Sequence, residues 1–382
     1  MKRLKRAGVC FAAAILLLLS GCWNYHELET YSIVSGVAVD KGQNGYKYHL
    51  SFECVDISET GENGGVQPLI IEADGNSVFD AVRSTQRESD KKLYFNHCKV
   101  VILSSGLAKE GIKPILDWFL RDAEPRVTLK FLVSKDPTAE EVLSVKPQSG
   151  QITAFQIVNT LGENASFYGS SPTMQLYEVN NTLNSDGIAL TLPAIETKKA
   201  QNGTTVQLAG LSVFRGDRQI GWLDDLPSKY FAFVRGKIAG GLILTGEGLD
   251  AAGLTLEILR SKTEVRPRVS GDRVTIRIEV HLEATVGEQN SAKNYLLENG
   301  FEGIQDHAEK TLETGITGMV GQVQKQYGSD IFGFGGKIHE DLPDDWDRLK
   351  PKWNKLFQTV KVEVSAEVKL RNSARVVQEG GK

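Results

Sequence analysis

Two long runs of alternating apolar and polar residues constrain the fold of this chain more than any other feature. They cover residues 274–285 and 360–370. A period of two places the apolar side chains on one face of a strand and the polar side chains on the other. Each run therefore predicts a strand in a sheet that is solvated on one face and covered by another layer on the other.

A long amphipathic helix is predicted between these two strands. Its apolar residues recur at spacings of three and four and form one stripe: Ile304, Ala308, Leu312, Ile316, Met319, Val323 and Tyr327. We expect the helix to lie across the apolar face of an antiparallel sheet, with the stripe in the core. A groove for a partner protein is the alternative interpretation of the stripe.

The first half of the chain predicts an alternation of strands and helices, which is typical of mixed α/β layers. Ser77 is the expected N-cap of one helix, and Pro137 is expected to open another at its first position. A single helix is predicted over 107–121, and a less regular helical region over 152–184. The expected strands are 33–39, 46–52, 69–73, 100–103, 127–133 and 188–195.

A length of 382 residues is typical of about two domains. The polar stretch at 198–204 is the expected boundary between them. The second half starts with a predicted hairpin, 206–223, that turns at Gly216-Asp217, followed by a short helix near Tyr230. The expected fold class is α+β and multi-domain, with mixed and antiparallel sheets each packed with helices. The expected division is an N-terminal α/β part over 22–200, a C-terminal domain with an antiparallel sheet and a long helix over 201–372, and a tail over 373–382.

The first 21 residues have the features of a lipoprotein signal peptide. Four basic residues within the first six positions precede an apolar run at 12–19, which is shorter than the roughly 20 residues of a membrane-spanning helix. The small residues Ser20 and Gly21 stand directly before Cys22, which is the lipobox arrangement of bacterial lipoproteins. The thiol of Cys22 would take a diacylglyceryl group and become the new N-terminus after cleavage. The alternative is a plain signal anchor with an incidental cysteine.

Such an anchor would hold the folded body close to a membrane. Two acyl chains give stable attachment, and the basic residues keep the leader's start on the cytoplasmic side. The tether over 23–30 could span only about 25 Å at roughly 3.5 Å per residue. The body is therefore expected outside the membrane, just above the lipid headgroups.

The composition argues against several other classes. The net charge of −4 and the lack of a basic patch give no reason to expect a nucleic-acid partner. No later apolar run has the length of a membrane span. Cys54 and Cys98 lie in strand-like apolar runs, where they are either two buried thiols or a disulfide formed outside the cytoplasm, and spacing alone does not decide.

No motif for catalysis, a cofactor or a metal is recognised. The six histidines show no ligand spacing, and H-E-x-x-H, C-x-x-C and G-x-S-x-G are absent from the sequence. The acids between 344 and 347 predict a helix start rather than a calcium loop. The glycine-rich run 332–336 follows a helix and predicts a buried or interface-facing turn rather than a phosphate loop. Trp346 and Trp353 share one helix face and are expected in the core, with a partner contact as the alternative.

Several segments, in this order, resemble one family. They are Gly-Cys-Trp-Asn at 21–24, the strand at 33–40, His-Cys-Lys-Val-Val at 97–101, Arg-Asp-Ala-Glu-Pro-Arg at 121–126, the segment 137–143, and Asp-Ile-Phe-Gly-Phe-Gly at 330–335. With Trp346, Trp353 and Phe357 before the last strand, the chain resembles the Ger(x)C lipoproteins, the C subunits of nutrient germinant receptors in endospore-forming bacteria.

The resemblance implies a non-enzymatic subunit with no catalytic residues and no cofactor beyond the covalent diacylglycerol at Cys22. It implies a place on the outer face of the spore's inner membrane, beside two membrane-spanning partners, the A and B subunits, in a complex that senses nutrients. It also implies several mixed-sheet α/β domains. The alternatives are a solute-binding lipoprotein of a transporter, which usually has two similar lobes, and a surface hydrolase.

Overall fold

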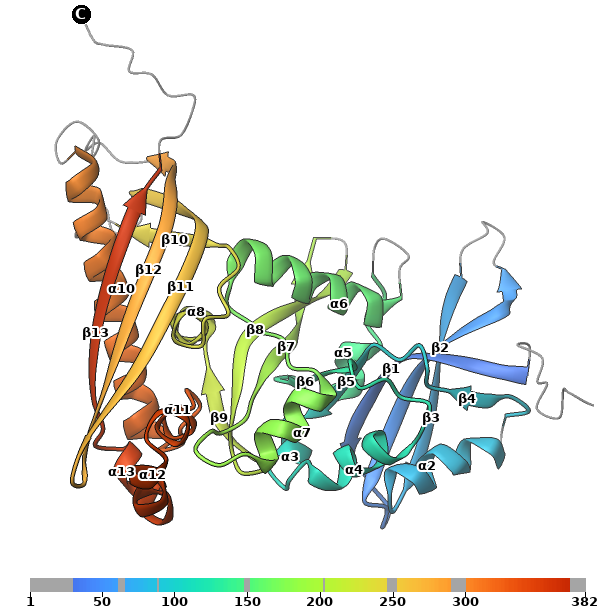
Figure 1. Ribbon diagram of the computed structural model, residues 1–382. Helices are drawn as coiled ribbons and strands as arrows, with labels where there is room; N and C mark the ends of the chain where they lie inside the picture. The colour runs from blue at the N-terminus through green and yellow to red at the C-terminus, as the bar shows by residue number, and fades with distance from the viewer. Residues whose placement is uncertain are drawn as a thin grey trace, which may run out of the picture.

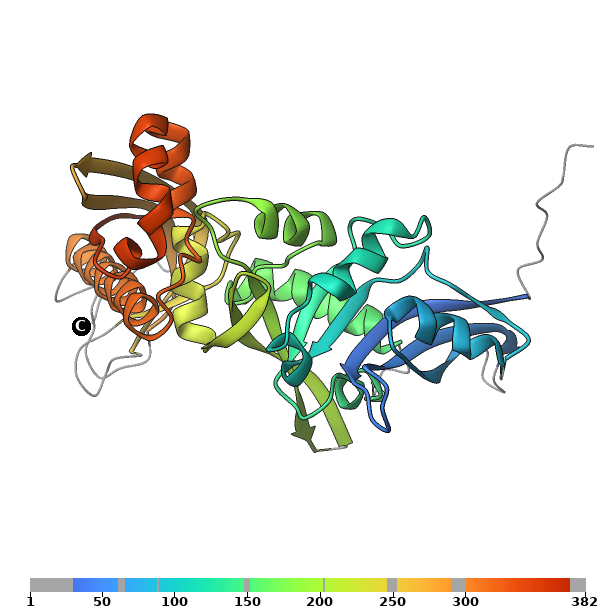
Figure 2. The same ribbon diagram turned by 90° about the horizontal axis from the view of Figure 1, so that it is seen from below.

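A computed structural model describes residues 30–60, 66–87, 89–147, 152–201, 203–245, 253–289 and 300–371. The expected signal peptide, Cys22, and the tail over 373–382 lie outside these residues. The described chain forms two sheets that lie beside each other along an elongated molecule (Figures 1 and 2). This arrangement confirms the predicted α+β class.

The first sheet has nine strands within the described residues, in the order β3-β2-β1-β5-β6-β7-β8-β9, with β4 also paired to β1. Its centre is parallel, from β1 through β5 and β6 to β7, and its flanks are antiparallel. The strands are β1 (Tyr31–Lys41), β2 (Tyr48–Thr60), β3 (Val66–Gly75), β4 (Lys92–Tyr94), β5 (Val100–Ser104), β6 (Lys130–Ser134), β7 (Thr191–Ala200), β8 (Gly203–Arg215) and β9 (Arg218–Leu223).

Helices cover both faces of this sheet. Apolar residues of α2, α4 and α7 join one buried cluster with Val101 and Phe131, and those of α5 and α6 join another with Ile102 and Leu132. This explains why β5 is buried at every position. The helices are α2 (Val78–Ser84), α3 (Ser105–Ala108), α4 (Lys113–Arg121), α5 (Ala139–Leu143), α6 (Thr153–Glu163), the π-helical turn η3 (Asn164–Tyr168) and α7 (Leu176–Asn184).

The local predictions for this half are partly confirmed. Ser77 caps α2, since its Oγ accepts from the amide of Asp80 at 3.1 Å. The single helix predicted over 107–121 is wrong: the chain forms α3 and α4, and Gly111 between them has a φ of +124°, which a helix does not allow. Pro137 precedes the cap of α5 rather than opening the helix, because Thr138 is the N-cap. The strand predicted from residue 127 begins at Lys130.

The second sheet has four strands within the described residues, in the order β10-β11-β12-β13. They are β10 (Leu242–Thr245), β11 (Leu254–Ser270), β12 (Arg273–Gln289) and β13 (Lys361–Leu370). The expected all-antiparallel sheet is wrong in one pair, because β13 runs parallel to β12. The long helix α10 (Gly300–Gln326) and the short helices after it return the chain to the end where β12 began, which makes the last strand parallel.

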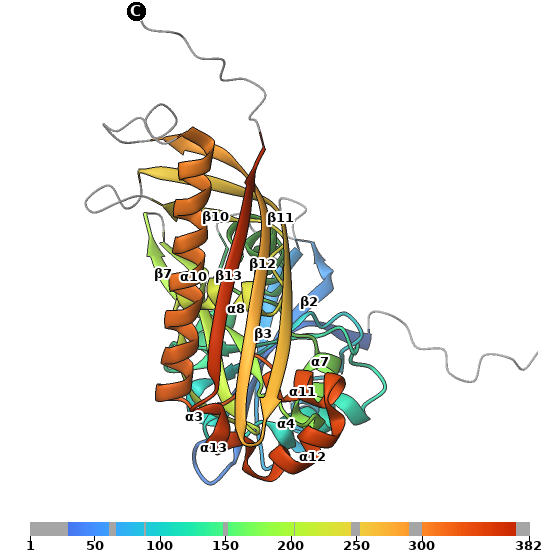
Figure 3. The same cartoon turned by 60° about the vertical axis from the view of Figure 1, so that its left-hand side comes forward.

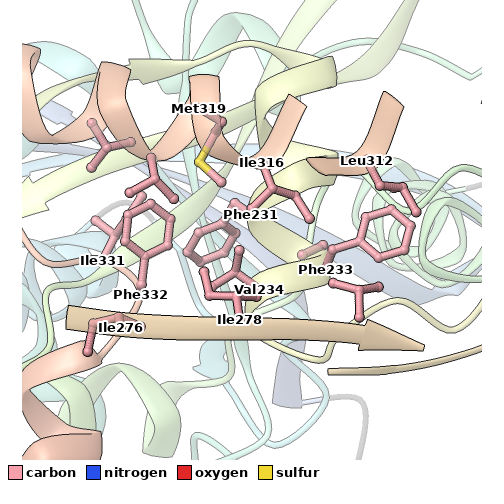
Figure 4. Close-up of a cluster of buried hydrophobic side chains, with 14 of the residues drawn as sticks. Phe231, Phe233, Val234, Ile276, Ile278, Leu312, Ile316, Met319, Ile331 and Phe332 are labelled. Atoms are coloured by element: carbon pink, nitrogen blue, oxygen red, sulfur yellow. The ribbon is translucent and has the colours of Figure 1, made fainter. Parts of the chain in front are cut away.

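Helix α10 lies along this sheet, as Figure 3 shows. All seven residues of the predicted stripe are at most 5% exposed, which confirms their place in the core. Ile316 and Met319 lie over Phe231 of α8 (Asp225–Val234), Leu312 lies beside Phe233 of the same helix, and Ile278 of the sheet lies on the other side (Figure 4). The three elements therefore share one hydrophobic core.

The expected division at residue 200 does not coincide with a break between the sheets. The polar stretch there is the exposed tip of the β7–β8 hairpin. The predicted hairpin with its turn at Gly216-Asp217 is present, as β8 and β9, and continues the first sheet. Leu211, Val213 and Leu223 of this hairpin also belong to the buried cluster of the second sheet. The two halves thus share apolar core at β8 and β9.

Candidate functional site at the junction of the two sheets

The one residue with a predicted chemical role, Cys22, lies outside the described residues. The described chain starts at Thr30, directly before β1. Strand β1 begins at the end of the molecule farthest from the second sheet (Figures 1 and 2). A tether at this end would leave the second sheet as the distal part of the body.

A buried carboxylate organises the segment that joins the two sheets. Asp330 is 4% exposed and accepts hydrogen bonds from the amides of Gly333 at 3.0 Å, Phe334 at 3.2 Å and Gly335 at 2.8 Å. Its Oδ2 also accepts from Nε1 of Trp353 at 3.0 Å. Burial raises the pKa of Asp330 to about 6, although these four donors oppose the shift. The carboxylate caps α11 (Phe334–Asp341), whose first amides would otherwise be buried without partners.

The glycine-rich run 332–336 is therefore a buried turn, as predicted. Phe332 and Phe334 are 3% and 1% exposed and stack with ring centroids 5.0 Å apart. Trp346 and Trp353 are buried in the same cluster, in edge-to-face contact at 5.6 Å, which confirms the core interpretation of both. The shared helix face is wrong, because Trp346 lies on α12 (Pro343–Leu349) and Trp353 begins a separate helix, α13 (Trp353–Phe357). Asp344 and Asp345 lie in the first turn of α12, which confirms the predicted helix start.

Backbone contacts link this turn to the loop between α7 and β7 of the first sheet. The amide of Gly336 donates to the carbonyl of Gly187 at 2.9 Å, and that of Ala189 donates to the carbonyl of Asp330 at 2.7 Å. Gly187 has a φ of +72°, and a Cβ placed on Gly335 would lie 2.7 Å from the Cα of Gly187. Glycine is needed on both sides because the two backbones touch.

Arg235 at the end of α8 adds a side-chain link at the same place. Its Nη1 donates to the carbonyl of Phe332 at 2.7 Å. Burial lowers the pKa of Arg235, while the negative charges of Asp330 and Glu178 oppose that shift. The guanidinium thus ties the end of α8 to the turn at 332–336 through the carbonyl of Phe332.

A cleft of about 1070 Å³ opens beside this junction. Its walls come from both parts: the loop 184–188, the end of α8, β11 near Thr263, and α11. Charged side chains on the walls form ion pairs: Lys337 lies 3.0 Å from both Glu340 and Asp341, and Arg266 pairs with Glu264. The Oγ1 of Thr263 is buried and has no hydrogen-bond partner among the described residues. The geometry is that of a polar groove with internally paired charges.

The two long edges of the second sheet differ. Helix α10 covers β13, because Gln305, Glu309 and Glu313 accept hydrogen bonds from the amides of Leu370, Val368 and Ala366 at 2.9–3.1 Å. On the other side, β10 pairs only with Leu254–Glu257 of β11 within the described sheet. The next part of β11 reaches the cleft at residues 263–266.

Two further buried acids act as helix caps in the first part. Glu53 accepts from the amides of Thr153 at 2.7 Å and Ala154 at 2.9 Å, at the start of α6. Asp40 accepts from the amides of Ala139 and Glu140 at the start of α5, and burial raises its pKa. Sequence reasoning missed both, although an acid inside an otherwise apolar strand is a signal for such a cap.

The two thiols of the described chain are buried and separate. Among these residues Cys54 and Cys98 are both buried and form no disulfide, so the structure favours the interpretation as two buried thiols. Burial raises the pKa of Cys54 to about 12 and also raises that of Cys98, which disfavours the nucleophilic thiolate. No cluster of three or more His, Cys, Asp or Glu suited to a metal occurs in the described ranges. None of the helices described there is both long and apolar enough to cross a membrane.

The fold is that of an elongated α+β protein with two sheets. Buried backbone contacts join the two sheets, and a polar cleft lies beside this junction. The chain belongs to the Ger(x)C family of spore germination proteins. The family described as Spore germination protein N-terminal domain matches residues 24–197, and the one described as Spore germination B3/GerAC like, C-terminal matches residues 209–374.

Curated relatives match over nearly their whole length. Spore germination protein KC of Bacillus subtilis (strain 168) is 25% identical, with 95% of this chain and 96% of the relative covered. Spore germination protein B3 of the same organism is 22% identical, with 98% and 100% covered. The crystal structure of the GerBC protein superposes with a TM-score of 0.54 at 18% identity, covering 91% of this chain and 100% of that one, and so shows the same fold.

Proposed function

We propose that this chain is the lipid-anchored C subunit of a nutrient germinant receptor, required for nutrient-triggered spore germination through protein–protein contacts. The A and B membrane subunits are its partners, and Cys22 carries the diacylglycerol that holds it on the outer face of the spore's inner membrane. It acts without catalysing a reaction. The observation that carries this proposal is the match of both halves of the chain to spore germination proteins.

Two features of the molecule support the anchored arrangement. The sequence places small residues directly before Cys22, and the tether from there to Thr30 is short. The described chain enters at one extreme end of the first sheet, so the junction and the second sheet extend away from the anchor (Figure 1). An elongated body held at one end exposes its long sides to membrane-spanning neighbours.

The anchor is tested by changing one cysteine at a time in spores of the producing organism. Cys22→Ala should leave unprocessed precursor, and nutrient-triggered germination should fall to the level of a deletion strain. Cys10→Ala is the matched control, because Cys10 lies in the part of the leader that would be removed. A Cys22→Ala protein that is still processed and lipidated, with germination intact, would refute the proposal.

A solute-binding lipoprotein is the alternative, and the cleft of about 1070 Å³ is the observation that favours it. A binder of this kind should melt several degrees higher with millimolar amounts of its nutrient, because a ligand bound to the folded state alone stabilises it. We expect no such rise in melting temperature, because the charged side chains on the cleft walls are already paired with one another.

A further inference from the structure

A second, smaller pocket on the first sheet collects positive charge. It has a volume of about 320 Å³ and lies where β5 and β6 begin, under the side of α6 that carries Phe155, Val158 and Asn159. Lys99, Arg126 and Lys130 line it, together with Thr128 and Gln175, and its described lining contains no acid.

The backbone holds two of these cations next to each other. The amide of Lys130 donates to the carbonyl of Lys99 at 3.0 Å, because the two residues enter neighbouring parallel strands. Burial and the like charge of Lys99 both lower the pKa of Lys130. An anion bound in the pocket would reduce this repulsion between the two lysine side chains.

No carboxylate in the described chain neutralises this group. Neither Lys99, Arg126 nor Lys130 forms an ion pair within the described residues, in contrast to Lys92, which lies 2.7 Å from Glu124. Arg126 donates from Nε to Oδ1 of Asn96 at 3.0 Å, and its terminal nitrogens have no partner among the described residues. Glu178, which follows Gln175 by three residues, accepts from the amide of Gln175 at 2.9 Å and lies 3.9 Å from Lys237.

We propose that the pocket lined by Lys99, Arg126 and Lys130 binds a phosphate group, carried either by a membrane lipid headgroup or by a small solute. Three cations beside the neutral donors of Thr128 and Asn159 suit an anionic group with several acceptor oxygens. The pocket lies close to the middle of β1, since the amide of Lys99 donates to the carbonyl of Ser35 at 2.8 Å. The lipid source rests on the proposed anchor, whereas the solute source does not.

The test measures how fast an amine-acylating reagent modifies individual lysines of the full-length chain in detergent. Phosphate at tens of millimolar, compared with chloride at equal ionic strength, should slow modification of Lys99 and Lys130 at least about threefold. Lys198 and Lys199, exposed at the end of β7, are internal controls whose rates should not change. Equal rates with and without phosphate at the pocket lysines, or equal slowing at all four, would overturn the site.

A variant pair checks the same site without chemical modification. The double change Lys99→Gln/Lys130→Gln should abolish the rise in melting temperature caused by phosphate, and Lys198→Gln/Lys199→Gln should retain it. The pocket variant should melt no lower than the original protein without phosphate, because it removes a repulsion. A pocket variant that keeps the full phosphate effect contradicts the proposal.

The two sources are separated by placing the lipidated chain in vesicles without free phosphate. Slower modification of the two pocket lysines in phosphatidylglycerol than in phosphatidylcholine identifies a lipid headgroup. Protection by phosphate but not by phosphatidylglycerol identifies a solute. If the chain does not stay on either vesicle, the anchor fails, while the phosphate measurement in detergent still decides the pocket.

Discussion

At the scale of single residues, buried carboxylates hold the starts of helices in place. Asp330, Glu53 and Asp40 each accept backbone amides at the first turn of a helix. A charged acceptor satisfies several donors that have no partner within the helix itself. Asp330 differs from the other two because it also holds the junction between the sheets.

The first prediction concerns the pH dependence that Asp330 gives to folding. Its pKa is about 6 in the folded chain, above the ordinary value of 3.8, so the folded state binds this proton more tightly than the unfolded state does. Its contribution to stability is therefore fully present below about pH 4 and is lost as the pH rises through 6. At 1.36 kcal/mol per unit, the difference is about 3 kcal/mol.

This is measured by urea unfolding of the original protein and Asp330→Asn at several pH values. Between pH 4 and pH 7, the free energy of unfolding of the original protein should fall relative to that of the variant, which cannot titrate. Asp306→Asn, an exposed acid on α10, should give a curve parallel to the original. Parallel curves for Asp330→Asn as well would show that Asp330 has an ordinary pKa.

An acid inside an apolar strand indicates a buried partner, but the helix that each of these acids caps could not be predicted from the local pattern. Glu53 and Asp40 precede the helices that they cap by about 100 residues. The acids at 344 and 345 could be predicted, because they lie in the same turn that they stabilise. A contact between distant segments leaves no periodic signal in the sequence.

At the scale of elements, the second sheet is protected at one edge by side chains of a helix. Gln305, Glu309 and Glu313 are spaced by four, so they form one row along α10 and meet alternate amides of β13. An edge strand with free amides is a template for pairing with another chain. The row of acceptors prevents this in the described sheet.

The second prediction removes one acceptor of this row. Glu309→Ala leaves the amide of Val368 without its partner at 2.9 Å and should lower the free energy of unfolding by about 1–2 kcal/mol. Asp306→Ala, one turn earlier on the exposed side, should change it by less than about 0.5 kcal/mol. Equal effects in denaturant unfolding would show that the edge contact contributes nothing.

The sequence predicts helices and strands with strong periodicity, but it does not predict how the strands pair in the sheet. The alternation of β12 and β13 and the stripe of α10 follow from the sequence because each depends on nearest neighbours along the chain. Strand β11 was missed, because charged residues and Pro267 interrupt its apolar pattern after Ile258. The direction of β13 was wrong because it depends on where the intervening helices end.

At the scale of the whole molecule, the two sheets act as one body through the contact of two backbones. Gly187 and Gly335 touch, and Arg235 joins α8 to the same turn. The polar stretch at 198–204, where the boundary was expected, is the exposed tip of the β7–β8 hairpin, and the first sheet continues through it to β9. The junction itself requires glycine at 187 and 335, because the two loops are in contact there. The sequence alone does not show this contact, since the loops are far apart along the chain.

The third prediction tests this junction. Gly187→Ala forces a side chain into the left-handed region and against the backbone of Gly335. The two costs together should lower the free energy of unfolding by about 2–4 kcal/mol. Gly162→Ala in α6, where a Cβ would meet no atom within 4 Å, should leave it unchanged or slightly raised. Similar melting temperatures for both variants would contradict the close contact.

This chain belongs to a family of spore germination proteins, so the central claim concerns the membrane and the proteins to which it is attached. The most direct measurement is a crosslinking and purification experiment on spore inner membranes that recovers this chain with whatever is bound to it. We predict a chain that begins at a diacylated Cys22, crosslinked along its long sides to two membrane-spanning proteins. Recovery of the chain alone, unlipidated and in the soluble fraction, would contradict the account.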